Sequence, residues 1–296
     1  MTKADLLTSF RSCKRYKQAP RWQKPWLNPG RFIRNQLNKH HLHTYRLAEL
    51  RKINAFHMPQ FTIVNGEGVG EQIASYGIYE ESLTEAFLRL VKPGQSVVDV
   101  GMHLGYYTTL FAVLVGEVGQ IHAFEPTPST RAVASHNVEG FDYVTVHPYA
   151  VWSSTCSIDF CDYGPQWMAF NSFTNPKVSV EPPVPTKIQV ETTTLDQFRD
   201  AFGGKVDLVK IDAESAEREI LLGAGRLIEV DKPIITVEMG DMDGKHCSRE
   251  LVDLLAALDY KPWEIVSDRF RLHQPLVEYG YDNLIFAPAY RDLSAI

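Results

Sequence analysis

The sequence predicts an α/β fold: a seven-stranded, mostly parallel sheet with helices on both faces, preceded by a basic N-terminal extension. Of the 296 residues, 44% are hydrophobic and 22% are charged, a globular composition that excludes disorder over the whole chain. After residue 94, strand patterns alternate with helical patterns, as in a parallel sheet with helical crossovers. We therefore expect a partly helical extension over residues 1–60 and one α/β domain over residues 61–296.

The charge is divided unevenly along the chain. Residues 1–52 carry 13 Lys and Arg against two Asp and Glu, or +11, so the remainder carries −17 of the total of −6. Such a basic arm could contact anionic lipid headgroups as a peripheral membrane contact, bind nucleic acid, or pack on the acidic domain within one molecule or across a homodimer. Packing on the domain is the favoured interpretation, and nucleic acid is not favoured because the acidic domain repels phosphates.

The N-terminal part is predicted as an irregular segment followed by two helices. Pro20, Pro25, Pro29 and Gly30 disfavour regular structure over residues 1–30, which we expect to be a docked or mobile tail. Apolar residues at near-helical spacing predict an amphipathic helix over Arg31–Ile53. A second helix is predicted over 79–91, where Pro93 and Gly94 follow.

The α/β domain is predicted from apolar runs bounded by turn residues. The expected strands are Ser96–Val100, Gln120–Phe124, Tyr143–His147, Val206–Ile211, Pro233–Val237, Pro262–Ser267 and Asn283–Ala287. The expected helices are Gly105–Val115, Pro128–Val138, Ser215–Leu227 and Cys247–Leu258. Residues 151–194 interrupt this alternation with a short strand (Ser157–Cys161) and a Pro-rich loop, and their aromatic and amide side chains suit either a substrate-covering insertion or a surface excursion packed by its own aromatics.

A glycine turn follows the first strand of the α/β domain. Asp99 ends the strand, and Gly101 and Gly105 lead into the next helix. Glycines let the backbone approach a ligand, and a helix start offers unpaired N–H groups. The second strand ends in Glu125, about 20 residues beyond the turn, where an acid can accept both ribose hydroxyls of a nucleoside cofactor.

The order of several motifs resembles the FkbM family of class I S-adenosylmethionine-dependent methyltransferases. The resemblance covers about residues 70–290. The matching stretches are Asp99 to Tyr107, Ala123 to Pro128, Asn137, Leu195-Asp196, Lys210 to Glu217 and Val237-Glu238. The chain departs from the family pattern at Met102-His103, where Ala-Asn is usual, and at Ser215, where Gly is usual.

The resemblance implies S-adenosylmethionine as cofactor. It places Asp99, Gly101 and Gly105 around the methionine part and Glu125 on the ribose, with Tyr106 and Pro126 as further cofactor-binding residues of the same motifs. It also implies methyl transfer to a hydroxyl of a sugar, glycan precursor or secondary metabolite.

Three residues are candidates for the catalytic step. Asp212 and Glu238 end strands at the edge that carries Asp99, and each suits a base, a group that holds substrate hydroxyls, or an oxygen ligand that shares a divalent cation with Asp241. His103 is a further candidate base, or a residue that only hydrogen-bonds within its turn. The sequence leaves these roles and the metal requirement open.

Two other functions fit parts of the sequence. An NAD(P)-dependent oxidoreductase uses a similar first βαβ unit, but the turn here lacks the middle glycine of G-x-G-x-x-G. A nucleic-acid methyltransferase would use the basic arm with Trp22, Trp26 and Phe32, yet Glu181-Pro182-Pro183-Val184 lacks a final stacking ring. The spacing of the four cysteines predicts no disulfide framework, and no run of residues is apolar enough to span a membrane, so we expect a cytoplasmic protein.

Overall fold

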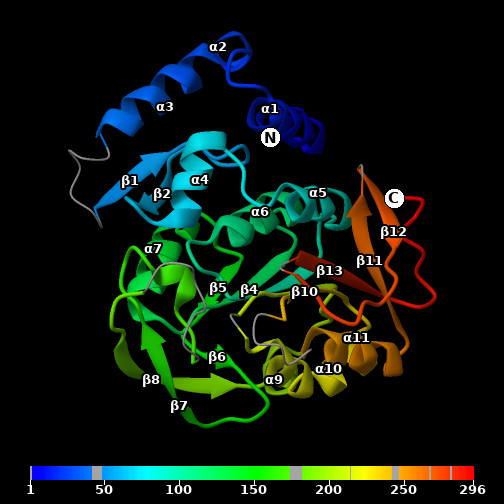
Figure 1. Ribbon diagram of the computed structural model, residues 1–296. Helices are drawn as coiled ribbons and strands as arrows, with labels where there is room; N and C mark the ends of the chain where they lie inside the picture. The colour runs from blue at the N-terminus through cyan, green and yellow to red at the C-terminus, as the bar shows by residue number, and fades with distance from the viewer. Residues whose placement is uncertain are drawn as a thin grey trace.

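A mixed sheet of eight strands forms the centre of the computed structural model, which describes residues 2–41, 49–173, 182–213, 215–241, 247–266, 268–280 and 282–296 (Figure 1). The strand order is β12-β11-β13-β10-β9-β3-β4-β5. The strands are β3 (Ser96–Val100), β4 (Gln120–Phe124), β5 (Val144–His147), β9 (Leu208–Ile211), β10 (Ile234–Met239), β11 (Tyr260–Val266), β12 (Arg269–Leu272) and β13 (Asp282–Pro288).

The sheet is mostly parallel, as predicted. Strands β5, β4, β3, β9 and β10 run parallel to one another, and β13 lies antiparallel between β10 and β11. All seven predicted strands are present within a few residues of their expected bounds. The expected count of seven is wrong by one, because β12 adds an antiparallel edge strand of which only Phe270 is buried. A strand with so little apolar pattern gives no signal in the sequence.

Helices cover both faces of the sheet, as predicted. One face carries α5 (Glu81–Leu90) and α6 (Tyr106–Val115), which contact the strands, and α4 (Gly68–Tyr76), which packs on β2 (Phe61–Val64) and α1 (Lys3–Gln18) and joins the same apolar core. The other face carries α8 (Leu195–Phe202), α9 (Glu217–Leu222), α10 (Gly225–Asp231) and α11 (Cys247–Ala257). Helix α7 (Pro128–Val138) packs beside α6 and has its predicted bounds.

The single helix predicted over 215–227 is wrong, because α9 and α10 are separate helices. The break falls at Gly223, where a Cβ atom would lie 2.2 Å from the carbonyl oxygen of Trp152. The close passage of the insertion past this point is a tertiary contact that no local pattern reveals. Helix α11 matches the helix predicted over 247–258 to within one residue.

The N-terminal residues are more ordered than predicted. Residues Lys3–Gln18 form a regular helix, α1, with a capping box at Thr2 and Asp5, so the expected irregular tail over 1–30 is wrong. Its apolar side, which includes Leu6 and Phe10, is buried against α4 and α5. Salt bridges from Lys14 to Glu85 and from Lys17 to Glu81 join this part of the basic arm to the acidic domain.

The helix predicted over Arg31–Ile53 is also wrong in its second half. After the short α2 (Lys24–Leu27), α3 covers Pro29–His41, and residues 42–48 of the predicted helix lie outside the described residues. Residues Leu50–Ile53 form strand β1, antiparallel to β2 (Phe61–Val64). Pairing of Leu50–Ile53 with the fully buried β2 outweighs the helical pattern at the end of the predicted helix.

The insertion over 151–194 forms a small sheet beside the main one. Its described strands are β6 (Ala150–Val151), β7 (Ser157–Asp162) and β8 (Thr186–Thr193), in the order β6-β8-β7, and a 3-10 turn covers Met168–Phe170. Strand β7 is the short strand predicted over 157–161. Residues 174–181 of the Pro-rich loop lie outside the described residues. Within the part of the chain that the structure describes, no helix has the length and apolar composition to span a bilayer.

Candidate active site

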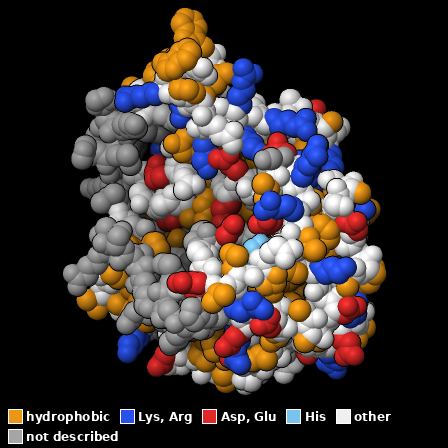
Figure 2. Space-filling model, turned by 45° about the vertical axis from the view of Figure 1, so that its right-hand side comes forward, with side chains coloured by type: hydrophobic (Ala, Val, Ile, Leu, Met, Phe, Trp, Pro, Cys, Tyr) orange, Lys and Arg blue, Asp and Glu red, His pale blue; other side chains and the backbone are white. Residues whose placement is uncertain are grey.

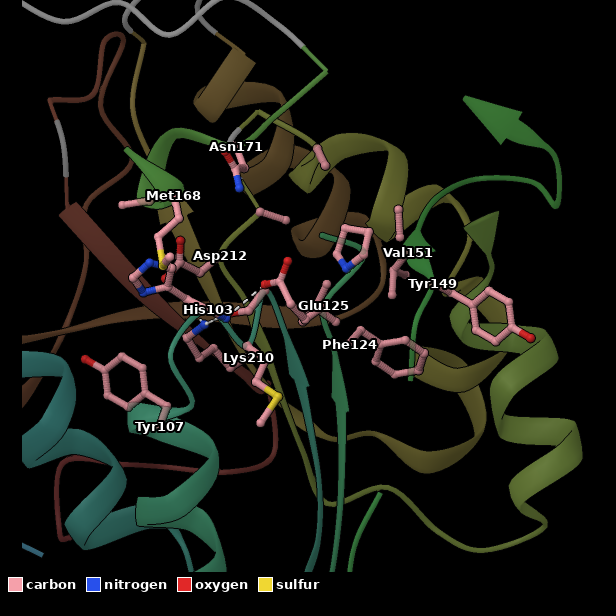
Figure 3. A pocket seen from close by; sticks show the side chains of 18 of the residues that line it. His103, Tyr107, Phe124, Glu125, Tyr149, Val151, Met168, Asn171, Lys210 and Asp212 are labelled. Carbon is pink, nitrogen blue, oxygen red and sulfur yellow. Dashed lines mark hydrogen bonds and ion pairs between the residues drawn. The ribbon is translucent and has the colours of Figure 1, made fainter. Parts of the chain in front are cut away.

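A pocket opens at the carboxyl ends of β3, β4 and β9, where ligands bind in open α/β sheets (Figure 3). It encloses about 970 Å³ of empty space, part of which is open to solvent. The glycine turn, the end of β4, the start of the insertion and the segment after β9 contribute its walls. Residues of the turn and of β4 in the wall are Gly101, Met102, His103, Tyr106, Phe124, Glu125 and Pro126.

The glycine turn has a backbone that only glycine accommodates at Gly101. This residue has a φ of 80°, and a Cβ atom there would lie 1.8 Å from the carbonyl oxygen of Asp212. The backbone N–H groups of Gly101 and Met102 both donate to the carbonyl oxygen of Phe124, at 3.2 and 3.0 Å. Asn137 fixes the far end of the turn through its Nδ2, which donates to the carbonyl oxygen of Leu104 at 2.9 Å. The turn is therefore held at both ends before any ligand binds.

A buried ion cluster lies beneath the turn. Lys210 Nζ lies 3.1 Å from Asp99 Oδ1 and 3.3 Å from Asp212 Oδ2, and it donates to the carbonyl oxygen of Gly101 at 3.1 Å. Burial alone would lower the pKa of Lys210, but Asp212 and Asp99 raise it above the ordinary value. Asp99 also accepts a hydrogen bond of 2.6 Å from Thr108, and burial raises its pKa. Lys210 thus stays charged and ties the ends of two strands to the turn.

Asp99 and Asp212 differ in their access to the pocket. The Asp99 side chain is fully buried and is not part of the pocket wall, whereas the Asp212 side chain is 26% exposed and lines it. Asp99 therefore acts on the pocket through Lys210. The sequence motif contains Lys210, but its role was not predicted. A lysine inside an apolar strand is itself a signal, because a buried cation requires a partner.

Glu125 lies at the end of β4 with its carboxylate in the pocket wall (Figure 3). One oxygen accepts the backbone N–H of His103 at 3.0 Å, and the other accepts that of Thr127 at 3.0 Å. Burial raises the pKa of this carboxyl to about 7 despite these hydrogen bonds. An ionised carboxylate has about four lone-pair sites, so acceptor capacity remains on the Glu125 carboxylate for ligand hydroxyls.

His103 projects from the glycine turn into the same pocket (Figure 3). Its backbone has a φ of 49°, which is uncommon for a residue with a side chain. The buried Nε2 has no hydrogen-bond partner among the described residues and lies 3.8 Å from Oε1 of Glu67. Burial lowers the pKa of the imidazole, so the neutral form persists below the usual range.

Glu67 was not predicted to belong to the site. Its side chain is fully buried and caps α4, accepting the N–H groups of Val69 at 3.0 Å and Gly70 at 2.6 Å. The residue stands in an Asn-Gly-Glu-Gly stretch far from the motifs, so the sequence offers no signal that it approaches His103.

Glu238 and Asp241 lie apart from the pocket wall. Glu238 pairs in register with Asn283 of β13, and the Asp241 carboxylate accepts the N–H groups of Ser248 and Tyr279 at 2.9 and 2.7 Å. Among the described residues, no three His, Cys, Asp or Glu side chains lie together so that they could hold a metal ion. The alternative in which Asp212 and Glu238 share a divalent cation with Asp241 thus gains no support from this part of the chain.

Tyr106 and Pro126 both line the pocket, as does part of the insertion. The Tyr106 hydroxyl accepts the backbone N–H of Tyr79 at 3.1 Å, which directs its polar end into the protein. The insertion residues in the wall are Val151, Phe160, Met168, Ala169, Asn171 and Phe173. The structure therefore brings the insertion and four of the proposed cofactor residues to one pocket, whereas Asp99 and Gly105 are not part of its wall.

The sheet with its glycine turn and strand-end acids is that of a Rossmann-like class I methyltransferase. The family model of the methyltransferase FkbM domain matches residues 99–262, which is more than half of the chain. The protein therefore belongs to the FkbM methyltransferase family and uses S-adenosylmethionine as its methyl donor. This result does not favour the alternative of an NAD(P)-dependent oxidoreductase.

Several solved structures are similar to this chain. Methyltransferase FkbM from Methylobacillus flagellatus KT is 14% identical with a TM-score of 0.44, and the match covers 95% of this chain and 58% of that protein. A putative rRNA-methylase from Clostridium thermocellum is 16% identical with a TM-score of 0.43, over 69% of this chain and 92% of the other. Aeropyrum pernix fibrillarin with bound S-adenosyl-L-methionine is 12% identical with a TM-score of 0.42, over 69% and 73%. No curated protein sequence matches the chain.

Proposed function

We propose that the protein is an O-methyltransferase that methylates a hydroxyl of a sugar, glycan precursor or secondary metabolite. The observation that carries this proposal is the imidazole of His103, which lines the pocket with its side chain 22% exposed. A hydroxyl must lose its proton as it gains a methyl group, so O-methylation requires a proton acceptor at this place.

The residues around the pocket fit the cofactor. Gly101 brings the backbone of the turn into the pocket wall at a position where a side chain would collide with the carbonyl oxygen of Asp212, and Glu125 keeps acceptor capacity for ribose hydroxyls. We assign cofactor binding to Gly101, Tyr106, Glu125 and Pro126, and we assign Gly105, which is not part of the wall, the role of shaping the turn. Asp99 is assigned a supporting role, in which it orients Lys210 beneath the turn.

The chain's own residues prepare the proton transfer. Bound S-adenosylmethionine supplies the methyl group from its sulfonium centre. Since burial lowers the pKa of His103, its imidazole is neutral near pH 7 and can take the hydroxyl proton. Glu67, at 3.8 Å, stabilises the imidazolium that results. Asp212 lines the same pocket and can hold a second acceptor hydroxyl, whereas Glu238 lies outside the wall and receives no role in this proposal.

The test is a product analysis with a panel of hydroxyl acceptors. Purified protein is incubated with a methyl-labelled donor, and NMR of the product separates O-methyl from N-methyl and C-methyl groups. We expect an O-methyl product, and calorimetry should show S-adenosylhomocysteine binding that Glu125→Gln weakens about tenfold. A product methylated only at nitrogen or carbon would contradict the proposal.

The role of His103 is tested separately. His103→Gln should lower kcat by about 10² to 10⁴ and leave S-adenosylhomocysteine affinity close to that of the wild type, because it removes the proton acceptor alone. His136→Gln is the matched control, since that histidine lies on α7 with its side chain 48% exposed. Unchanged kcat in His103→Gln would exclude this histidine as the base.

A further inference from the structure

Helices α2 and α3 present an apolar side to solvent. We call residues 21–37 the N-terminal ridge, which stands above the rest of the molecule in Figure 1. Four of its large apolar side chains are exposed, at 71% for Trp22, 86% for Trp26, 57% for Ile33 and 52% for Leu37. Trp22 lies in the turn before α2 and Trp26 in α2, while Ile33 and Leu37 are about one turn apart on one side of α3. Scattered exposed apolar residues are ordinary, but four large ones on one short ridge are not, and we call these four side chains the apolar stripe.

The ridge turns its polar side toward the protein. Arg31 donates to the carbonyl oxygen of Tyr76 and lies 3.2 Å from Cys13 Sγ, and Asn35 Nδ2 donates to the carbonyl oxygen of Ser75 at 2.9 Å. Lys24 lies over the rings of Tyr16 and Tyr76, at 5.5 and 5.3 Å. A surface helix of a globular protein ordinarily buries its apolar side and exposes its polar side. The ridge has the opposite orientation, which indicates that its apolar side contacts a partner outside the described chain.

The segment that carries this apolar stripe is rich in positive charge. The sequence from residue 6 to residue 48 contains ten Lys and Arg and no Asp or Glu. Arg21 is exposed next to Trp22, and burial together with the charges of Arg31 and Arg51 lowers the pKa of Arg34. Figure 2 shows hydrophobic side chains that project at the top of the molecule, with Lys and Arg side chains beside them.

We propose that the N-terminal ridge docks on the surface of an anionic lipid bilayer. Trp prefers the membrane interface, and basic residues beside apolar ones add attraction to anionic headgroups. The stripe projects outward, and a bilayer takes up projecting side chains without a shaped groove, whereas a protein partner would need one. Charge complementarity selects anionic rather than neutral lipid.

The position of the ridge links it to the pocket. Ser75 and Tyr76, which receive the polar side of the ridge, end α4, while Val69 at the start of α4 lines the pocket. Six helical residues span about 9 Å. Docking would therefore hold the pocket close to the lipid headgroups. An acceptor attached to a lipid could enter the pocket from that surface.

The test is co-sedimentation of the full chain with vesicles. One set is phosphatidylcholine alone, and the other contains about a quarter phosphatidylglycerol, both at about 0.15 M salt. We expect binding to the anionic set only, and the double substitution Trp22→Ser with Trp26→Ser should lower the partition coefficient at least about tenfold. The double substitution Ile33→Ser with Leu37→Ser, at the other end of the stripe, should lower the partition coefficient to a similar extent.

The matched control is Val118→Ser with Tyr290→Ser, which removes two side chains that are 81% and 76% exposed elsewhere in the chain. It should bind vesicles like the wild type, and equal thermal unfolding of all variants shows that they fold. Failure of the wild type to bind anionic vesicles overturns the proposal, as does undiminished binding by both ridge variants. The proposal is also overturned if the wild type does not bind vesicles and the Trp substitutions instead abolish dimer formation or RNA binding. None of these outcomes tests whether the protein transfers methyl groups.

Discussion

Gly101 is the residue at which the glycine turn passes closest to the strand-end segment of β9. The hypothetical Cβ lies 1.8 Å from a backbone atom, the carbonyl oxygen of Asp212, which cannot rotate away as a flexible side chain could. The backbone itself is in the left-handed region, with a φ of 80°. Shape and conformation therefore both select glycine here.

Substitution Gly101→Ala should distort the turn and the cofactor pocket together. We expect the free energy of unfolding to fall by at least about 2 kcal/mol, and S-adenosylhomocysteine binding to be lost in calorimetry. Gly140→Ala is the control, because a Cβ atom at that position meets nothing within 4 Å. Cofactor binding by Gly101→Ala equal to that of Gly140→Ala would show that the turn does not form the cofactor site.

Lys210 is a buried cation whose removal leaves Asp99 without a compensating charge. Lys210→Met should lower the free energy of unfolding by about 3–5 kcal/mol in urea titrations near pH 7. Because burial already raises the pKa of Asp99, this loss should shrink at lower pH, where the carboxyl becomes neutral. The double variant Lys210→Met with Asp99→Asn should recover part of the loss. Equal stability of the single and double variants would mean that the two charges do not interact.

The residues of the site were predictable where they belong to a local motif. Asp99, Gly101 and Glu125 each stand at a strand end or in a turn, and topology brings such positions to one edge of a sheet. Glu67 reaches His103 through the packing of α4 against the turn, and no pattern of spacing encodes that contact. Glu238 also ends a strand, but its register partner Asn283 belongs to an antiparallel strand outside the pocket wall.

At the scale of elements, α1 shows how an N-terminal helix becomes part of the core. Leu6 and Phe10 are each 1% exposed, and the Phe10 ring meets the Phe56 ring edge to face at 5.6 Å. Lys14 forms salt bridges with both Glu85 and Asp268. The helix therefore seals the face of the sheet that α4 and α5 cover.

Substitution Phe10→Ala should cost about 3–4 kcal/mol in the free energy of unfolding, since it opens a cavity between α1 and the core. Urea unfolding followed by circular dichroism measures the change. Arg11→Ala, on the exposed side of the same helix, should change stability by less than about 0.5 kcal/mol. A small loss in Phe10→Ala would show that α1 contributes little to the core.

The elements that the sequence predicted are those with strong internal patterns. Strands such as β3 and β9 are mostly apolar and buried, with Asp99 and Lys210 as exceptions, and α7 begins at a proline and keeps its predicted bounds. The prolines at 20, 25 and 29 predict irregular structure only locally, since all three follow the end of α1 at Gln18, and so they do not oppose a helix over Lys3–Gln18. The sequence does not predict strand β1, because β1 forms through pairing with β2 and its own residues lack a strand pattern.

At the scale of the whole molecule, two sets of buried groups make stability depend on pH in opposite directions. Burial raises the pKa values of three carboxyl groups to about 7; they are Glu80, Glu125 and Glu217. Burial lowers the pKa of His57 to about 3 and that of His122 to about 4, and it lowers the pKa values of His103 and His147.

These shifts predict a fall in the stability of the cofactor-free protein as the pH rises from about 6.5 to about 7.5. In that range the folded state releases protons from carboxyls that the unfolded state already released near pH 4.5, and the histidines of both states are mostly neutral. Between about pH 4.5 and 6.5 the two sets oppose one another, because the carboxyls lose stability as the pH rises and the histidines gain it. Urea midpoints measured from about pH 5 to about 9 should therefore change little below about pH 6.5, fall through about pH 7 and level off above about pH 8.

Glu125→Gln isolates one carboxyl of this set. Between about pH 6.5 and 8.5, the free energy of unfolding of the variant should fall by roughly 1 kcal/mol less than that of the wild type, because glutamine has no proton to release. This difference does not depend on the absolute stability of the variant. Glu139→Gln is the control, since that side chain is 79% exposed and should leave the slope unchanged. A slope in Glu125→Gln identical to that of the wild type would mean that this carboxyl is already ionised at neutral pH, in which case the cofactor's ribose would meet a charged acceptor without a prior proton release.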